Sequence, residues 1–322
     1  MSLFSDYWGD GDDAGGFADD VLGGAFEVVE GMDSLLEKEG VTLEDVLLDK
    51  SIIEEVAGRG DKLLEFLLRD SELEKLLMFV EKLPDDGASV ETRVKFPYLS
   101  CEVICVGESR ILDRVCEAKH LAMLFSILDY APDKVLASSV GEQNLGYFEK
   151  IVDKLLVTRT NRILRFVQER GLPIFDQMVA HIYCDAVKAV LAKLLLPGAA
   201  LVRYGGDFDA GNPFPLWLDW PEKSAAHVAG ALLAKAREAV EADAAVNAGL
   251  LLAELVGTDP GEAGNPVADE VCATPMLAQL RQLVAYAPAD DELGRARLAA
   301  ALEALTAVAK RAMHSQGPTE LV

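Results

Sequence analysis

The sequence predicts an all-α protein built from many short helices, and three observations lead to this fold class. Apolar residues recur at helical spacing in one segment after another, helix-capping residues precede several of these segments, and turn residues separate them. The clearest stretch is 42–83, and its last predicted helix carries one apolar stripe that consists of Leu73, Leu76, Leu77 and Val80. Because no repeat of fixed length is present, we expect irregular stacked helical repeats, a HEAT- or armadillo-like α-solenoid.

Helix starts are marked most clearly in the first part of the chain. In a capping box, a hydroxyl side chain and a carboxylate three residues later satisfy the free N–H groups of the first turn. Three pairs match this pattern: Thr42 with Asp45, Ser51 with Glu54, and Ser71 with Glu74. Gly58 and Gly60 interrupt the chain before the helix expected at Asp61, and segment 84–87 predicts a turn.

The later helices are predicted from apolar stripes and from alanine content. Stripes continue through segments 148–156, 175–182 and 187–195, and Pro197-Gly198 ends them. The composition then shifts towards alanine, and we expect helices at 225–242, 247–256, 275–287 and 290–314. Prolines predict loops at 203–222 and 257–268.

These patterns divide the chain into four parts. We expect a disordered, acidic, Gly- and Asp-rich arm at 1–31 and a helical array at 32–198. A loop carrying Trp217 and Trp220 is expected at 199–224, followed by an alanine-rich helical continuation at 225–322. Tryptophan is favoured at binding hot spots, but Leu216-Trp217-Leu218 also suits a helix packed on the core, which we prefer for Trp217.

Charge excludes several classes of partner. The chain has 54 Asp and Glu against 30 Lys and Arg, a formal net charge of −24. Nucleic acids and anionic membrane surfaces are bound through Lys and Arg, so we expect neither as a partner. The longest apolar stretch, 186–196, contains Lys188 and Lys193 and is too short to span a bilayer.

Cysteine usage and the N-terminal residues point to the cytoplasm, with the nucleus as a second location. The five cysteines lack the spacing of a disulfide framework, so we expect reduced intracellular thiols. Residues 1–6 contain neither a basic stretch nor an apolar one, so we expect no secretory signal there.

Two cysteine pairings were weighed as chemical sites. Cys101 and Cys105 are four residues apart and can share a helix face, as metal ligands do, but no second pair or histidine lies at ligand spacing. His181 and Cys184 lie on one face of an apolar helix, and a thiol nucleophile would also need an orienting group. Burial in the core is the preferred interpretation for both pairs, and we expect no catalytic, cofactor or metal site.

Several segments resemble the SAPS domain, which defines the regulatory subunits of protein phosphatase 6. The resemblance opens at 33–49 and 62–67, and its most specific short motif is Arg93–Glu102, RVKFPYLSCE. It continues through 121–170 and more loosely through 175–196, with weaker traces at 216–218 and 247–256. The acidic N-terminal segment departs from the family, since only Phe4, Tyr7 and Trp8 resemble its opening aromatic run.

The resemblance implies a non-catalytic subunit. Its helical array would bind the catalytic subunit of a protein phosphatase 6-like serine/threonine phosphatase and direct it to substrates, with a third scaffold subunit as a further partner. A generic helical-repeat adaptor or transport scaffold without a phosphatase remains the alternative. A cysteine-dependent enzyme using Cys101 or Cys184 is the third hypothesis.

The first candidate contact for a partner is Lys95-Phe96-Pro97-Tyr98 within the resembling motif. Since Pro97 disfavours helix at Phe96, we expect a loop between two helices that presents Phe96 and Tyr98. Packing of both rings against the next helix is the alternative.

The second candidate contact is a basic ridge formed by Arg159, Arg162 and Arg165. A positive ridge on an acidic chain suits an acidic partner. The alternative is that carboxylates of the same chain neutralise it, which is the commoner outcome for surface charges.

Overall fold

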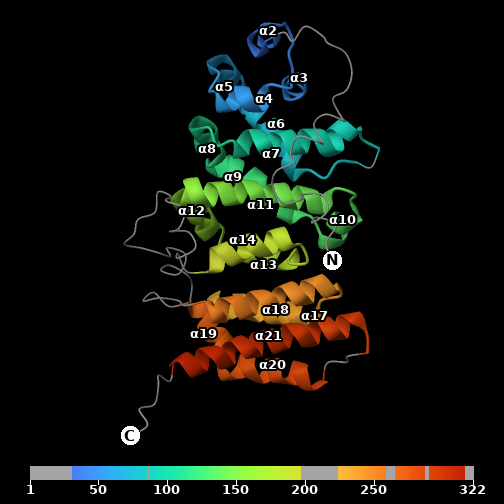
Figure 1. Ribbon diagram of the computed structural model, residues 1–322, viewed down its shortest axis with the longest axis vertical. Helices are drawn as coiled ribbons and strands as arrows, with labels where there is room; N and C mark the ends of the chain where they lie inside the picture. Colours follow the sequence, from blue (N-terminus) through green and yellow to red (C-terminus); the bar gives the residue numbers. More distant parts are fainter. Residues whose placement is uncertain (1–30, 86, 197–223, 259–264, 287–289, 316–322) are drawn as a thin grey trace.

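The computed structural model describes residues 31–85, 87–196, 224–258, 265–286 and 290–315. Within them it contains 18 α-helices, one π-helical turn, one 3-10 turn and no strand, which confirms the all-α prediction. The helices are stacked in layers along the long axis, from α2 at one end to α20 at the other (Figure 1). The predicted arm at 1–31 lies outside the described residues except for Gly31. The predicted loop at 199–224 also lies outside them, except for Ser224.

The helices vary widely in length. The first layers comprise α2 (Met32–Leu36), α3 (Leu43–Leu47), α4 (Ile52–Ala57), α5 (Asp61–Leu67), α6 (Asp70–Glu81), the π-helical turn η1 (Glu91–Lys95), α7 (Phe96–Cys105), α8 (Ser109–Val115) and α9 (Ala118–Phe125). The middle layers comprise the 3-10 turn η2 (Ser126–Asp129), α10 (Pro132–Ala137), α11 (Gly141–Thr158), α12 (Thr160–Arg170), α13 (Leu172–Ala180) and α14 (Asp185–Leu195). The last layers comprise α17 (Ser224–Glu238), α18 (Ala242–Gly257), α19 (Pro266–Cys272), α20 (Thr274–Tyr286) and α21 (Glu292–Ser315).

Of the three predicted capping boxes, only the one at Thr42 forms. There the Asp45 backbone N–H donates to the Thr42 hydroxyl at 3.3 Å, and the Thr42 N–H donates to the Asp45 carboxylate at 3.0 Å. The Ser51 hydroxyl instead donates to the Asp49 carboxylate at 2.7 Å, because this neighbouring acceptor is closer than the helix start. The third prediction is also wrong, since α6 begins at Asp70 and Ser71 lies inside its first turn.

Two predicted boundaries near the C-terminal end need correction. The helix predicted at 225–242 ends at Glu238, and α18 begins at Ala242. The loop predicted at 257–268 gives way to α19 at Pro266. Proline fits the first turn of a helix because the N–H there has no intrahelical acceptor, and the Asn265 side chain caps the turn by accepting from Val267 and Ala268.

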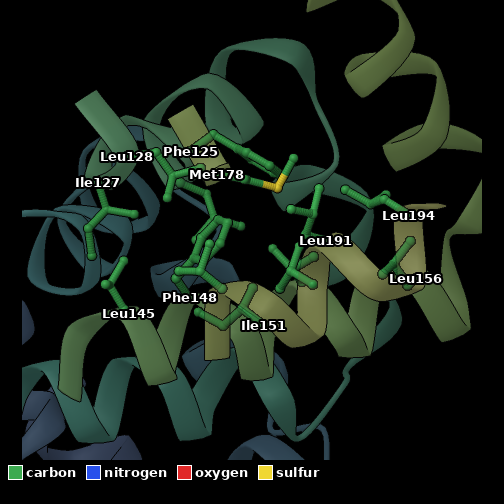
Figure 2. Close-up of a cluster of buried hydrophobic side chains, with 14 of the residues drawn as sticks. Phe125, Ile127, Leu128, Leu145, Phe148, Ile151, Leu156, Met178, Leu191 and Leu194 are labelled. Atoms are coloured by element: carbon green, nitrogen blue, oxygen red, sulfur yellow. The ribbon is translucent and has the colours of Figure 1, made fainter. Parts of the chain in front are cut away.

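One hydrophobic core runs through the stack. The predicted stripe on α6 is fully buried, as are the stripes on α11 and α14. Figure 2 shows how consecutive layers interlock: Phe125 of α9, Phe148 of α11, Met178 of α13 and Leu191 of α14 point into one cluster. The rings of Phe125 and Phe148 meet edge to face, with centroids 5.0 Å apart.

The alanine-rich helices continue the same stack, because α13 packs against α17 and α14 against α18. Asn247 of α18 is buried at this junction. Its side-chain amide donates to the carbonyl groups of Ile182 at 2.9 Å and Tyr183 at 3.2 Å, in the connection between α13 and α14. The amide therefore satisfies backbone acceptors that would otherwise be buried without partners.

We expect Asn247→Ala to lower the free energy of unfolding by about 1–3 kcal/mol, because two buried carbonyl groups lose their donor. Urea denaturation followed by circular dichroism measures this loss. The control is Glu254→Gln, an exposed position on the same helix, which should change stability by about 0.5 kcal/mol or less. Equal stability of the two variants would show that the Asn247 bonds contribute nothing.

Candidate interaction surface

The segment that carries the most specific family motif is helical, so the prediction of a loop is wrong. The π-helical turn η1 runs directly into α7, and Phe96 has helical backbone angles, φ −65° and ψ −43°, although Pro97 follows it. Pro97 lies in the first turn of α7, where its missing N–H costs little. A π turn is wider than an α turn and is a common site where a helix admits an inserted or bulky group.

Phe96 and Pro97 belong to the core rather than to the surface. Phe96 is 7% exposed, and its ring centroid lies 5.1 Å from that of Phe79 on α6. Lys95 is half-buried. The alternative weighed from the sequence, packing against a neighbouring helix, is therefore the correct one for Phe96.

Tyr98 is exposed, and two valines extend its apolar surface. Val90 is 63% exposed, Val94 36% and Tyr98 37%, and they recur every four residues along η1 and α7. This spacing places all three on one side of the helical segment. We call these residues the η1–α7 strip. Sequence reasoning missed the two valines because the assumed break at Pro97 hid the continuous helical spacing.

Helix α11 supports the strip from the side. The Tyr147 ring lies 6.4 Å from the Tyr98 ring, and the Gln143 side-chain amide donates to the Tyr147 hydroxyl at 2.7 Å. One helical turn further along, Lys150 of α11 forms an ion pair with Glu102 of α7. The Tyr98 phenol is neutral at physiological pH because a tyrosine ordinarily has a pKa of about 10, and partial burial raises the pKa of Tyr98 further. The strip is therefore an uncharged surface on a braced helix.

The predicted arginine ridge is largely neutralised by the chain itself. Arg159, between α11 and α12, donates to the Asp113 carboxylate at 2.9 Å and to the Ser109 hydroxyl at 2.8 Å. Arg162 shares the same carboxylate at 3.1 Å. A cavity of about 520 Å³ lies beside them, lined by Ser109, Asp113, Arg159, Asn161 and Arg162. Arg159 therefore ties α8 to the α11–α12 junction, in agreement with the alternative that carboxylates of the same chain neutralise the ridge. Arg165, by contrast, is exposed on α12.

The side chains weighed for thiol chemistry are buried. The His181 ring contacts the Tyr130 carbonyl through Nε2 at 2.9 Å and the Tyr183 hydroxyl through Nδ1 at 3.2 Å, so both nitrogens are engaged away from Cys184. Burial raises the pKa of the Cys184 thiol to about 11, which makes it a poor nucleophile. Burial in the core is thus confirmed for His181, Cys184 and Cys101, whereas the prediction is wrong for Cys105, which is half-buried at the end of α7.

The described residues hold neither a metal-binding cluster nor a helix that could cross a membrane. No three or more His, Cys, Asp or Glu side chains there are grouped so that they could hold a metal ion. Among the helices of the same residues, none has both the length and the apolar character needed to cross a bilayer.

Comparison with known proteins gives consistent matches in one group. The chain is 31% identical over 166 residues to serine/threonine-protein phosphatase 6 regulatory subunit 3 of Gallus gallus, which covers 51% of this chain and 18% of that protein. It is 28% identical over 167 residues to regulatory subunit 2 of Mus musculus, covering 51% and 17%. Regulatory subunit 3-B of Xenopus laevis is 29% identical over 167 residues, covering 51% and 19%.

These matches span less than a fifth of the length of the curated relatives. No family model matches the chain, and no solved structure matches it. The helical architecture, the motif on η1 and α7 and the similarity to several phosphatase 6 regulatory subunits agree with one another. Over about half of its length the chain is similar to regulatory subunits of protein phosphatase 6, in agreement with its resemblance to the SAPS domain.

Proposed function

We propose that this protein is a non-catalytic targeting subunit that binds the catalytic subunit of a protein phosphatase 6-like serine/threonine phosphatase. The observation that carries the proposal is the similarity to proteins named as regulatory subunits of that phosphatase. Any metal ions and acid–base groups of the reaction would then belong to the partner. The contribution of this chain would be a rigid helical surface that holds the enzyme and directs it to substrates.

The η1–α7 strip is the proposed contact for the catalytic subunit. Three adjacent exposed apolar side chains on a braced helix offer area for burial without a large loss of conformational entropy. Tyrosine is enriched among residues that dominate binding energy. Arg165 is exposed on α12 and supplies positive charge on a chain with a net charge of −24, which favours an acidic patch on the partner.

Co-purification tests the function. The full chain, carrying an affinity tag, should retain the recombinant catalytic subunit of protein phosphatase 6 in a stoichiometric complex. Failure of the correctly folded chain to retain it would make the assigned function wrong and favour the alternative of a helical adaptor without a phosphatase. The third scaffold subunit expected from the resemblance should be tested by adding lysate to the preformed complex.

Within that complex, we expect Tyr98→Ala to weaken binding about tenfold or more, as loss of a hot-spot aromatic does. The matched control is Leu136→Ala on α10, which removes a side chain of similar exposure, 41%, away from the strip. Titration calorimetry measures the affinity of both variants for the catalytic subunit. If Tyr98→Ala and Leu136→Ala bind equally well, the strip is not the contact, although the function itself would stand.

Truncation of Phe96 and truncation of Tyr98 should differ in how much they destabilise the fold. Phe96→Ala should lower the free energy of unfolding by about 3 kcal/mol, because a buried ring leaves a cavity against Phe79. Tyr98→Ala should cost about 1 kcal/mol or less, since the ring is exposed. Thermal denaturation compares them, and an equal loss would show that Tyr98 is a core residue rather than a contact residue.

A further inference from the structure

Two thiols on α7 lie beside two lysines on α11. The sulfur atoms of Cys101 and Cys105 are 3.9 Å apart, one helical turn from each other. Cys101 is fully buried, and its sulfur also lies 3.8 Å from the Tyr147 carbonyl oxygen. Cys105 is the last residue of α7 and is half-buried, so solvent reaches it.

The lysines place positive charge next to the more exposed thiol. Lys150 pairs with Glu102, which lies between the two cysteines in sequence. Lys154, one turn further along α11, lies across the end of α7: a Cβ added to Gly107 would be 2.5 Å from its Cε and 2.7 Å from its Nζ. Among the described residues, no ion pair neutralises Lys154, so its charge is available to a neighbouring anion.

We propose that Cys105 is a modification site, a thiol that undergoes exchange with small anionic disulfides, activated by Cys101, Lys150 and Lys154. The inference concerns the chemistry of the chain itself and does not depend on the phosphatase partner. The ligand class follows from the ammonium group of Lys154, which attracts a negatively charged reagent to a thiolate that Lys150 and Lys154 both stabilise.

The physical reason why Cys105 rather than Cys101 ionises is the difference in burial. A thiolate at Cys101 would be cut off from water, so Cys101 keeps its proton and can donate it to the Cys105 sulfur. A charged acceptor competes better for that donor than the neutral carbonyl of Tyr147 does. Partial burial, the Glu102 carboxylate and the C-terminal end of a helix all oppose an anion at Cys105, but the thiol donor and the lysines outweigh them and lower its pKa.

The other three thiols lie in environments that disfavour the thiolate. Burial raises the pKa of Cys116 and of Cys184 to about 11 and also raises that of Cys272. Cys272 is half-buried like Cys105, yet no thiol donor lies beside it among the described residues. It therefore serves as an internal reference: a half-buried thiol without a neighbouring thiol donor.

The reaction is a balanced exchange. The Cys105 thiol loses its proton to solvent, and the thiolate attacks one sulfur of the small disulfide. A new sulfur–sulfur bond forms at Cys105 while the original one breaks, and the leaving thiolate takes up a proton. Cys105 is oxidised to a mixed disulfide, the reagent is reduced to one thiol, and a thiol reductant reverses the step.

The test uses the full chain and two disulfide probes, anionic dithiobis-nitrobenzoate and uncharged dithiodipyridine, with the modified residues identified by peptide mass spectrometry. Cys105 should be modified first with either probe, about ten times faster than Cys272. Cys101→Ala should slow Cys105 at least threefold, whereas Cys101→Ser, which keeps a donor at the same place, should retain most of the rate.

Comparison of the anionic and the uncharged probe shows how much the lysine charge contributes to the reaction rate at Cys105. Lys154→Gln should slow the anionic probe more than the uncharged one, and Lys50→Gln, an exposed control on another helix connection, should change neither rate. Since Lys154 lies at the edge of the helix pair, this variant tests the site even if Cys101→Ala fails to fold. Equal rates at Cys105 and Cys272, or a rate at Cys105 that is unchanged by both Cys101→Ala and Lys154→Gln, would overturn the proposal.

Discussion

Phe148→Ala is expected to lower the free energy of unfolding by about 3–5 kcal/mol, the largest loss among the single substitutions considered. Phe148 is fully buried on α11 and meets Phe125 of α9 edge to face (Figure 2). Truncation removes the transfer free energy of the ring and leaves a cavity that neighbours from several helices can fill only in part. Loss of the edge-to-face contact adds to this cost.

Urea denaturation at several protein concentrations measures how much Phe148→Ala lowers the free energy of unfolding. The control is Leu48→Ala, which truncates a side chain that is 42% exposed at the end of α3 and should cost about 1 kcal/mol or less. Because α11 contacts α6, α7, α12 and α14, the unfolding transition of the variant should move as a whole. A loss below about 1.5 kcal/mol would show that the layers around Phe148 can close over the missing ring.

Gly249→Ala is the second substitution with a large expected effect, although it adds only one methyl group. A Cβ at this position on α18 would lie 2.8 Å from the Ala300 carbonyl oxygen and closer still to the Ala300 Cα and Cβ on α21. Backbone atoms cannot rotate away, so the two helices must separate. Overpacking of this kind costs about 1–3 kcal/mol, and we expect a value at the upper end because the clash is with backbone.

The matched control for Gly249 is Gly230→Ala in the interior of α17. There the added Cβ would find only Met276 Cε, at 3.8 Å, which is an ordinary contact. Alanine lowers the entropy of the unfolded chain relative to glycine, so this control should gain about 0.5–1 kcal/mol. Differential scanning calorimetry of the two variants should shift the midpoint in opposite directions, and a gain in both would mean that α18 and α21 do not pack so closely.

The periodic pattern was sufficient to predict the helices and their buried faces. The stripe from Leu73 to Val80 is fully buried as expected, because helical spacing is a local property that any apolar neighbour satisfies. The family resemblance was likewise readable from short segments and agrees with the comparisons. Helix boundaries were less well predicted: the sequence predicts a loop through Ala268, whereas α19 begins at Pro266, because proline suits both a loop and a first helical turn.

What surrounds each residue was decided only by the tertiary structure. Phe96 was expected in a loop, yet it packs on Phe79, and the adjoining π turn allows the helix to pass Pro97. Arg159 and Arg162 read as a free ridge until the fold brought Asp113, 46 residues from Arg159, within bonding distance. Charge pairing and exposure depend on which helices meet, and that information is absent from the spacing within any one helix.

The sequence by itself thus determined that this protein is a stack of amphipathic helices and that it resembles the regulatory subunits of protein phosphatase 6. Only the tertiary structure decided that the η1–α7 strip faces solvent and that Lys154 of α11 lies across the end of α7, next to Gly107. The physical reason is the separation along the chain over which each interaction acts. Apolar periodicity and helix capping act over three to four residues, whereas a surface or a thiol environment is assembled from side chains that are tens of residues apart.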